Sequence, residues 1–410
     1  MQTACPPLGA AGRSLEERLP NLIEQLAEVA DLDATAARYG ALIRRRGVPS
    51  AEVLLKLAFL YGLGGYSFRT TAALAHGLGI VSLTDTAILE RLRRLAPWLE
   101  HLLAGLLERR ALPAPLAALD RALTIVDGTS LSLPGSTGTD WRLHLRYDPV
   151  AGRLVAVRIG DAHDAESLTH FPLRPRDLVL GDRFYAKAKA LIGVIDQGGD
   201  FLVRTGWSSL RLYDADTGQL FVVPDRLLTV TDEEAHEFRV LIESGKGGKR
   251  RRIAARLIVR RKPPDHARRA TAQAKRKASK AQKTMRPETA LAANFLMLVT
   301  SLDGERFPAP LVLALYRLRW QVELAIKRLK GLVGIKAIPV NDPDLVQVWL
   351  LIHLIAAVLV EDIASHVLAF SPSATRHNHP AAVPVASAPD RAPADPAHLT
   401  GGIDARRSAQ

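Results

Sequence analysis

The sequence predicts an α/β protein, in which a mixed β-sheet follows an all-α N-terminal domain and is interrupted by a β-rich insertion. Residues 1–118 carry apolar side chains at three- and four-residue spacing, which is typical of amphipathic helices. From Ala122 onward the pattern changes to short apolar or alternating runs bounded by turn residues, which is typical of strands. With 410 residues, 48% of them hydrophobic, the chain can bury a large core and divide into two or three domains.

The helical N-terminal domain contains a candidate helix-turn-helix between Ser67 and Arg94. One helix is expected to end near Gly77, and a second to start after Ser82 or Thr84. Such a pair can read DNA, but two amphipathic helices joined by a glycine turn are about as common in an ordinary helical bundle. The nearby basic side chains that a DNA backbone could contact are Arg44, Arg45, Arg46, Arg91, Arg93 and Arg94.

The middle of the chain alternates strands and helices in a recognisable order. We expect three strands, a helix, a strand, a helix and a further strand, which indicates a ribonuclease H-like mixed sheet. The segments are, in chain order, 123–126, 141–147, 153–159, 165–171, 178–180, 186–196 and 201–204.

Two of the expected strands deliver an aspartate at their carboxyl ends. Asp127 follows the apolar run 123–126, and Asp182 follows the run 178–180. If the two strands pair side by side, the carboxylates can share a cation at the sheet edge, and hard oxygen ligands suit magnesium. Each aspartate alone is more simply explained as the first residue of a turn. The metal site is favoured only if a third acid occurs together with other side chains that could bind DNA.

That third acid is Glu323, within the segment Leu311–Leu332, which has the period of one long amphipathic helix. Steps of three, four and seven residues return to nearly the same helical face, so we expect one stripe of functional side chains. In a simpler interpretation, Arg319 and Glu323 are an ordinary surface ion pair at i and i+4. The members of the stripe are Tyr316, Arg319, Glu323, Lys327 and Lys330.

The spacing of Tyr316, Arg319, Glu323 and Lys330 resembles the Tyr-Arg-Glu-Lys signature of the DDE transposases of insertion-sequence family four. Asp127-Gly128-Thr129 and Gly181-Asp182-Arg183-Phe184-Tyr185 resemble the first two acidic motifs of that family. The resemblance covers roughly residues 40 to 360, although three short stretches carry its specificity.

The resemblance implies a DNA transposase that cleaves and joins strands at insertion-sequence ends. It implies that Asp127, Asp182 and Glu323 bind two Mg²⁺ ions, for which Mn²⁺ can substitute. DNA contacts are implied for Tyr316, Arg319, Trp320, Lys327 and Lys330. Trp320 would stack on a displaced base, although a tryptophan on a helix more often packs in the core. Ala325 and Ile326 lie at positions where many members of the family have aromatic residues.

The segment 207–291 exceeds what a ribonuclease H-like fold needs, and its alternating runs predict a β-rich insertion. Within it, Lys249–Arg286 contains sixteen Lys or Arg residues against one acid, Asp265, and so carries a net charge of +15. The whole chain has a formal charge of +13 and a pI near 10.1, so the phosphate-binding charge is concentrated here. We expect contact with the DNA backbone, through a helix over Ala270–Thr284.

The sequence thus divides into a helical N-terminal domain (1–118), a catalytic core (119–206 and 292–368), the insertion (207–291) and a tail (369–410). Pro, Ala, Ser and His dominate the tail, which predicts disorder. His377 and His379 form at best a weak metal pair there. The single cysteine, Cys5, excludes a disulfide framework and indicates a reducing cytoplasm.

No signal pattern is present, and the longest apolar run, Leu345–Val360, is expected to be a buried core helix too short to cross a bilayer. We therefore expect no membrane partner. The expected partners are double-stranded DNA, as terminal inverted repeats and target, and a second copy of the chain, since two ends must be cut together. The expected location is the bacterial cytoplasm, beside the nucleoid.

Three other functions fit parts of the sequence. A stand-alone nuclease could use the same three acids and would cleave without joining ends. An inactive transposase remnant would bind terminal repeats without metal. A small-molecule enzyme is opposed by the basic block and by the lack of a glycine-rich phosphate loop.

Overall fold

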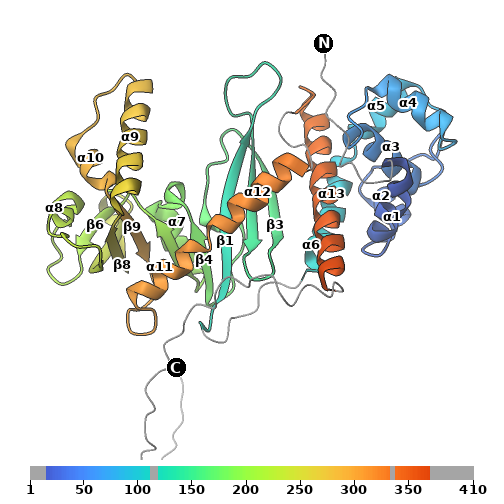
Figure 1. Cartoon of the computed structure of the whole chain (residues 1–410). Coiled ribbons are helices and arrows are strands. Elements are labelled where there is room, and N and C mark those ends of the chain that lie inside the picture. Colours follow the sequence, from blue (N-terminus) through green and yellow to red (C-terminus); the bar gives the residue numbers. More distant parts are fainter. Residues whose placement is uncertain (1–14, 111–118, 333–337, 370–410) are drawn as a thin grey trace, which may run out of the picture. The chain divides into compact units, whose positions relative to one another are not determined.

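The computed structural model describes residues 15–110, 119–332 and 338–369. These residues form a mixed α/β structure built on one nine-stranded sheet (Figure 1). The strand order is β3-β2-β1-β4-β5-β9-β8-β7-β6. The expected α/β class with a mixed sheet is confirmed, and the expected disordered tail, with His377 and His379, lies outside the described residues.

The first five strands fall in the predicted places. β1 (Ala122–Leu131), β2 (Trp141–Asp148) and β3 (Arg153–Asp161) form an antiparallel meander. β4 (Asp177–Gly181) then pairs with β1 in parallel, and β5 (Asp200–Arg204) pairs with β4 in parallel. The helix expected at 165–171 is a single 3-10 turn, η1 (Leu168–His170), and a second turn, η2 (Arg183–Tyr185), precedes α7 (Ala188–Asp196).

The insertion continues this sheet. β7 (Ala235–Ser244) is antiparallel to both of its neighbours, β6 (Arg211–Asp214) and β8 (Arg251–Arg261). β8 then pairs with β9 (Phe295–Thr300), which pairs with β5. One of the alternating runs that predicted strands in the insertion, 220–223, does not form a strand, because Leu220 forms one isolated bridge and the chain then enters α8 (Val223–Leu228). Pro224 in the first turn of α8 favours that helix start.

Helices fill the N-terminal region as predicted. The helix-turn-helix candidate is formed by α4 and α5, with Ser67 and Thr84 as N-caps whose hydroxyls accept from the amides of Thr70 and Ala87. Within residues 15–110 the helices are α1 (Leu15–Ala27), α2 (Leu32–Arg38), α3 (Ala51–Gly62), α4 (Phe68–Gly77), α5 (Asp85–Leu92) and α6 (Ala96–Glu108).

The last described helix, α13 (Pro343–Ala369), joins the N-terminal helices to the sheet, since it contacts α3, α6 and β3. Its stretch Pro343–Ile363 extends beyond the expected apolar run Leu345–Val360, contains an 18-residue window with a mean hydropathy of 2.0, and is long and apolar enough to cross a membrane by length and composition alone. However, 78% of the apolar window is buried inside the protein, which confirms that it is a core helix.

Segment 311–332 is not one helix, as predicted, but two. α11 (Ala309–Arg317) ends just before Arg319, and α12 (Trp320–Leu332) begins just after it. At the junction the amides of Leu318 and Arg319 bond three residues back, to Leu315 and Tyr316, which tightens the chain into a 3-10 turn.

The remaining helices are α9 (Pro264–Lys280) and α10 (Pro287–Ala293), which pack against each other. The basic helix expected at 270–284 is confirmed, but it begins and ends earlier than predicted. Apolar side chains cover both sheet faces. One cluster unites α1–α6 and α11–α13 with Ile125 and Leu145, and the other unites α7 and the insertion with Val126.

Candidate active site

The register of β1 and β4 brings the first two acids together. Ile125 is paired with Leu180 in the parallel ladder. Two residues further along each of these segments, Asp127 therefore lies beside Asp182. Asp182 lies directly after β4, as predicted. Asp127 does not end its strand, because β1 continues to Leu131, so the prediction that it follows the strand is wrong.

The carboxyl group of Asp127 is poorly solvated. Burial, together with the nearby charges of Asp182 and Glu323, raises its pKa to about 6, although the amide of Gly128 and the charge of Arg319 oppose the shift. The carboxylate of Asp182 accepts a 2.7 Å hydrogen bond from the amide of Phe184. A buried aspartate whose pKa is raised further by two neighbouring acids belongs to a site that a divalent cation would stabilise.

Arg319 links the third acid to the first. Its Nη2 donates to Glu323 Oε1 at 2.6 Å, and its Nη1 lies 3.8 Å from Asp127 Oδ2. The side chain of Arg319 is 20% exposed, whereas that of Glu323 is 50% exposed. The surface ion pair considered from the sequence is therefore present, but it is anchored beside the aspartates by a largely buried arginine.

The three carboxylates do not converge on one point. Among the described residues, the one set of three His, Cys, Asp or Glu side chains with ligand atoms within 4.8 Å of one another is His144, Asp164 and His170. The position of Arg319 between Asp127 and Glu323 accounts for the wider separation, because a guanidinium there neutralises both acids.

Two buried tyrosines lie near the acids. Tyr316 is buried, its ring lies 5.9 Å from the Arg319 guanidinium, and burial raises its pKa to about 12. Tyr185, within the second acidic motif, is also buried, and burial with the charge of Asp127 raises its pKa. Sequence reasoning gave Tyr185 no role, although its place three residues after Asp182 was a usable signal.

Cations and one exposed aromatic ring surround the acids. Arg183 follows Asp182 in the chain, and Arg204 ends β5. Burial and the charges of these two arginines lower the pKa of Lys262 to about 8. Lys277 of α9 lies 6.0 Å from the ring of Phe184, which is 58% exposed. The basic helix therefore borders the loop that carries Asp182, a neighbourhood that the sequence alone did not reveal.

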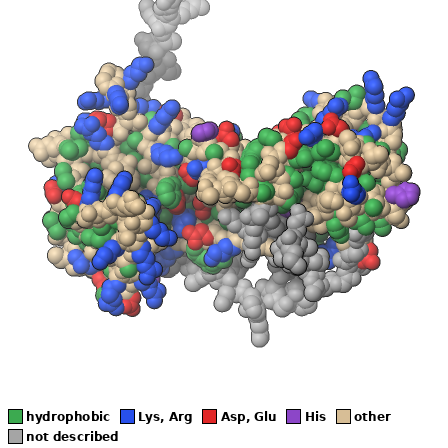
Figure 2. Space-filling model, turned by 90° about the horizontal axis from the view of Figure 1, so that it is seen from above, with side chains coloured by type: hydrophobic (Ala, Val, Ile, Leu, Met, Phe, Trp, Pro, Cys, Tyr) green, Lys and Arg blue, Asp and Glu red, His purple; other side chains and the backbone are tan. Residues whose placement is uncertain are grey.

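The basic block has two different halves. In β8, the guanidinium of Arg251 pairs with Asp196, that of Arg252 with Glu243 and that of Arg256 with Glu237, so these charges are satisfied within the fold. In α9 no residue is buried. Figure 2 shows the Lys and Arg side chains gathered on the side of the protein that carries α9, next to acidic side chains nearer the middle.

The other predicted DNA-contacting residues lie on α12. Trp320 is 54% exposed at its first turn, so the alternative that it packs in the core is not what the structure shows. Lys327 is exposed two turns further on. The side chain of Lys330 lies outside the described part of the protein.

A sheet that sets two aspartates side by side, next to a glutamate and a rim of cations, is the arrangement of an enzyme that acts on nucleic acid. Residues 118–359 match the Transposase DDE domain family, which is more than half of the chain. The chain therefore belongs to the family of DDE-domain transposases, as its three motifs indicated.

Curated relatives agree with this assignment. InsL of insertion sequence element IS186A from Escherichia coli K12 is 34% identical over 355 residues, which cover 86% of this chain and 95% of InsL. The transposase of insertion sequence element IS421 from Escherichia coli is 34% identical over 356 residues, with the same coverage. The protein is thus a DNA transposase of insertion-sequence type, from a family whose enzymes use divalent metal ions.

A solved structure of the piggyBac transposase synaptic complex with hairpin DNA is also similar. Its sequence identity is 9% and its TM-score is 0.41, with coverage of 86% of this chain and 74% of that chain.

Proposed function

We propose that Asp127, Asp182 and Glu323 hold two divalent metal ions, Mg²⁺ or its substitute Mn²⁺, for strand cleavage and strand transfer at insertion-sequence ends. The observation that carries this proposal is the pairing of β1 and β4, which sets Asp127 beside Asp182 next to Arg319 and Glu323. The donor set suits the ions, because it is made of carboxylate oxygens whose mutual repulsion helps to raise the pKa of Asp127. The strand order β3-β2-β1-β4-β5 supports a ribonuclease H-like core.

Divalent ions bound there would lower the pKa of an attacking water or DNA 3′-hydroxyl and neutralise charge on the leaving oxygen. The protein supplies position and charge. Arg319 exchanges its carboxylate partners for a DNA phosphate, since a guanidinium binds both groups with the same paired donors. Tyr316 holds Arg319 in place from the core side, and its 9% exposure supports this positioning role over direct DNA contact.

DNA is proposed to run from α12 to α9. Lys327 and Lys330 would contact phosphates beside Glu323, and Trp320 would stack on a displaced base. On the other side of the acids, the basic face of α9 would hold the backbone without reading sequence.

End recognition is proposed for the helical domain 1–118, through α4 and α5. Arg93 is engaged internally, with its guanidinium 2.7 Å from Asp342, whereas Arg94 is exposed. We also propose that the protein forms a homodimer that joins two transposon ends. The chain would divide into a core (119–206 and 292–368) and an insertion (207–291), and the protein would act in the cytoplasm beside the nucleoid.

The test is magnesium-dependent cleavage of a supercoiled plasmid that carries the element's own terminal repeats. Wild type is compared with Glu323→Gln, and Glu305→Gln serves as the matched control, because Glu305 is an exposed glutamate in the loop before α11. We expect excision and strand joining by wild type and Glu305→Gln, and at least a roughly 100-fold loss in Glu323→Gln.

Each of the other outcomes would indicate a different function or a different role of Glu323. Nicking without joining would indicate a stand-alone nuclease. Specific binding without cleavage by any variant would indicate an inactive remnant. Equal cleavage by wild type and Glu323→Gln would overturn the role of Glu323.

A further inference from the structure

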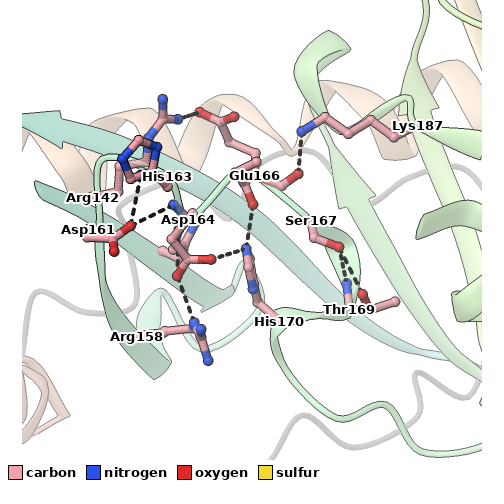
Figure 3. A network of polar contacts seen from close by, with 12 residues as sticks. Arg142, Arg158, Asp161, His163, Asp164, Glu166, Ser167, Thr169, His170 and Lys187 are labelled. Carbon is pink, nitrogen blue, oxygen red and sulfur yellow. Dashed lines mark hydrogen bonds and ion pairs between the residues drawn. The ribbon is translucent and has the colours of Figure 1, made fainter. Parts of the chain in front are cut away.

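A second group of ligating side chains lies on β2 and the segment that follows β3. It consists of His144, Asp164 and His170, whose ligand atoms lie within 4.8 Å of one another. The Nε2 of His144 is 3.6 Å from Asp164 Oδ2, and the Nε2 of His170 is 3.6 Å from Asp164 Oδ1. Figure 3 shows the Asp164 carboxylate between the side chains of His170 and Arg158.

His144 is the unusual member of this group. It is completely buried, yet neither ring nitrogen has a hydrogen-bond partner. A buried imidazole without partners is costly, since a buried polar group normally finds a donor or an acceptor. Its ring lies 4.2 Å from that of His170 and its Nε2 faces Asp164, so the unpartnered nitrogen points into the cluster.

The cluster is separate from the three acids. His144 pairs with Gly128 in the antiparallel ladder, whereas Asp127 pairs with Leu145. Because successive residues of a strand project to opposite faces, His144 and Asp127 lie on opposite sides of the sheet. An ion held by His144 would not be one of those held by Asp127.

We propose that His144, Asp164 and His170 form a binding site for a transition-metal dication of the Zn²⁺ type. Two imidazoles and one carboxylate are a common zinc ligand set, and imidazole nitrogens do not suit Mg²⁺. In a tetrahedral zinc site with bonds near 2.0–2.1 Å, neighbouring ligand atoms are about 3.3 Å apart. The two 3.6 Å separations reach different oxygens of Asp164, and one ligand atom from each side chain lies within 4.8 Å of the others, so binding requires a contraction and a turn of the carboxylate.

Neighbouring groups fit this assignment. Glu166 is occupied by Arg142, whose Nη1 lies 2.5 Å from its carboxylate, so the fourth position falls to a water molecule. Arg158 donates to Asp164 Oδ2 at 2.9 Å, but its side chain is 52% exposed and can turn away. The bound ion would tie β2 to η1 directly behind the strand that carries Asp127.

His170 has a contact that binding would alter. Its Nε2 donates to the carbonyl oxygen of Ala165 at 2.8 Å. Coordination through Nε2 exchanges that hydrogen bond for a metal bond, whereas coordination through Nδ1 keeps it as outer support for the ligand.

The experiment titrates the full-length chain, freed of metal by a chelator, with Co²⁺ and follows the visible bands of tetrahedral cobalt. The background is Asp127→Asn with Glu323→Gln, which removes two of the three acids proposed for catalysis. In that background His170→Gln is the test, and His163→Gln is the matched control, because His163 is a nearby histidine outside the cluster.

We expect one equivalent of tetrahedral Co²⁺ in the background protein and in His163→Gln, displaced by Zn²⁺. Affinity should fall by about tenfold or more in His170→Gln. Arg158→Gln should bind Co²⁺ more tightly, because it removes the cation that competes for Asp164.

The absence of tetrahedral bands from the background protein would overturn the proposal, as would equal affinity in His170→Gln. If His170→Gln fails to fold, Arg158→Gln decides, and unchanged affinity in that variant would count against the site. A failure here leaves the role of Glu323 untouched, since the plasmid assay tests that role independently.

Discussion

Arg319 donates a 2.6 Å hydrogen bond to Glu323, so a positive charge lies against the third acid of the proposed metal site. The same guanidinium lies 3.8 Å from Asp127. Arg319 therefore neutralises two of the carboxylates that are proposed to bind metal. It must release them for the ions and the DNA phosphate to bind, so substitutions of Arg319 should separate metal binding from catalysis.

Replacing Arg319 with Gln should have opposite effects on these two properties. Mn²⁺ affinity of the DNA-free protein should rise roughly two- to fivefold, because the competing ion pair is removed. Cleavage of terminal-repeat DNA should fall by about 100-fold, since the reacting phosphate no longer has a charged donor beside it. Calorimetric Mn²⁺ titration and the plasmid assay measure the two effects.

Arg317→Gln is the matched control, because Arg317 is an exposed arginine two residues away. It should change neither property by more than about twofold. A fall in Mn²⁺ affinity in Arg319→Gln would show that Arg319 supports the metal ligands instead of competing for them.

The pKa of Asp127 predicts a pH dependence of stability in the metal-free protein. A folded-state pKa of about 6, against the usual 3.8, means that the folded state binds the proton more tightly. Below pH 3.8 Asp127 is protonated in both states and does not lower the stability. As the pH rises from 3.8 to 6, the free energy of unfolding falls, because the carboxyl group ionises less readily in the folded state. The full penalty, about 3 kcal/mol, remains at higher pH.

Asp127→Asn should therefore stabilise the metal-free protein at about pH 8 and have little effect at about pH 4, as measured by chemical denaturation with a chelator present. Asp140→Asn is the control of opposite sign. Hydrogen bonds from Leu133 and Ser136 lower the pKa of Asp140, so its contribution to stability is present above pH 3.8 and is lost as the pH falls. A destabilised Asp127→Asn under the alkaline condition would contradict the assignment.

The sequence predicted the two strands that bring Asp127 and Asp182 side by side, because the signals for those strands are local. Apolar runs before Asp127 and Asp182 are buried strands, and their pairing follows from a parallel ladder. The break near Leu318 could not be predicted, because a 3-10 turn leaves the amphipathic period of 311–332 nearly intact.

Contacts between distant segments could not be predicted from the sequence for a different reason. Nothing local indicates that β8 pairs with β9 and extends the catalytic sheet, or that Lys277 reaches Phe184. The basic block likewise looked uniform, although the fold uses the β8 arginines as ion-pair partners and leaves α9 without a buried residue.

The division of the basic block predicts different salt dependences of DNA binding. Lys275→Ala with Lys280→Ala, both on α9, should lower the slope of log affinity against log salt by about 0.9 for each phosphate that the variant no longer neutralises. The decrease in affinity should be similar for terminal-repeat and unrelated DNA, because backbone contacts carry no sequence information.

Arg251→Ala with Arg252→Ala is the matched control, since both guanidinium groups are paired within the fold. This pair should leave the slope nearly unchanged. If the β8 variant lowered the slope as much as the α9 variant, the proposed division of the block would be wrong. Filter binding between low and physiological salt measures both slopes.

Two adjacent arginines at the end of α6 predict very different stability effects. Arg110 is 3% exposed and donates to the carbonyl oxygens of Leu154 and Val358, as well as to the carboxylates of Glu361 and Asp362. It thus joins the N-terminal helices, β3 and α13. Burial holds the pKa of Glu361 above its usual value, and Arg110, together with the amide of Leu154, compensates for part of that burial.

Arg110→Ala should lower the free energy of unfolding by about 3–5 kcal/mol, because it removes the cation beside two partly buried acids and the donor to two backbone carbonyl groups. Arg109→Ala should cost less than about 1 kcal/mol, since Arg109 pairs with Glu28 at the surface. Chemical denaturation of both variants at neutral pH measures the difference. Equal decreases would show that the buried cluster contributes no more than a surface pair, and that apolar packing of α13 alone joins the helical domain to the sheet.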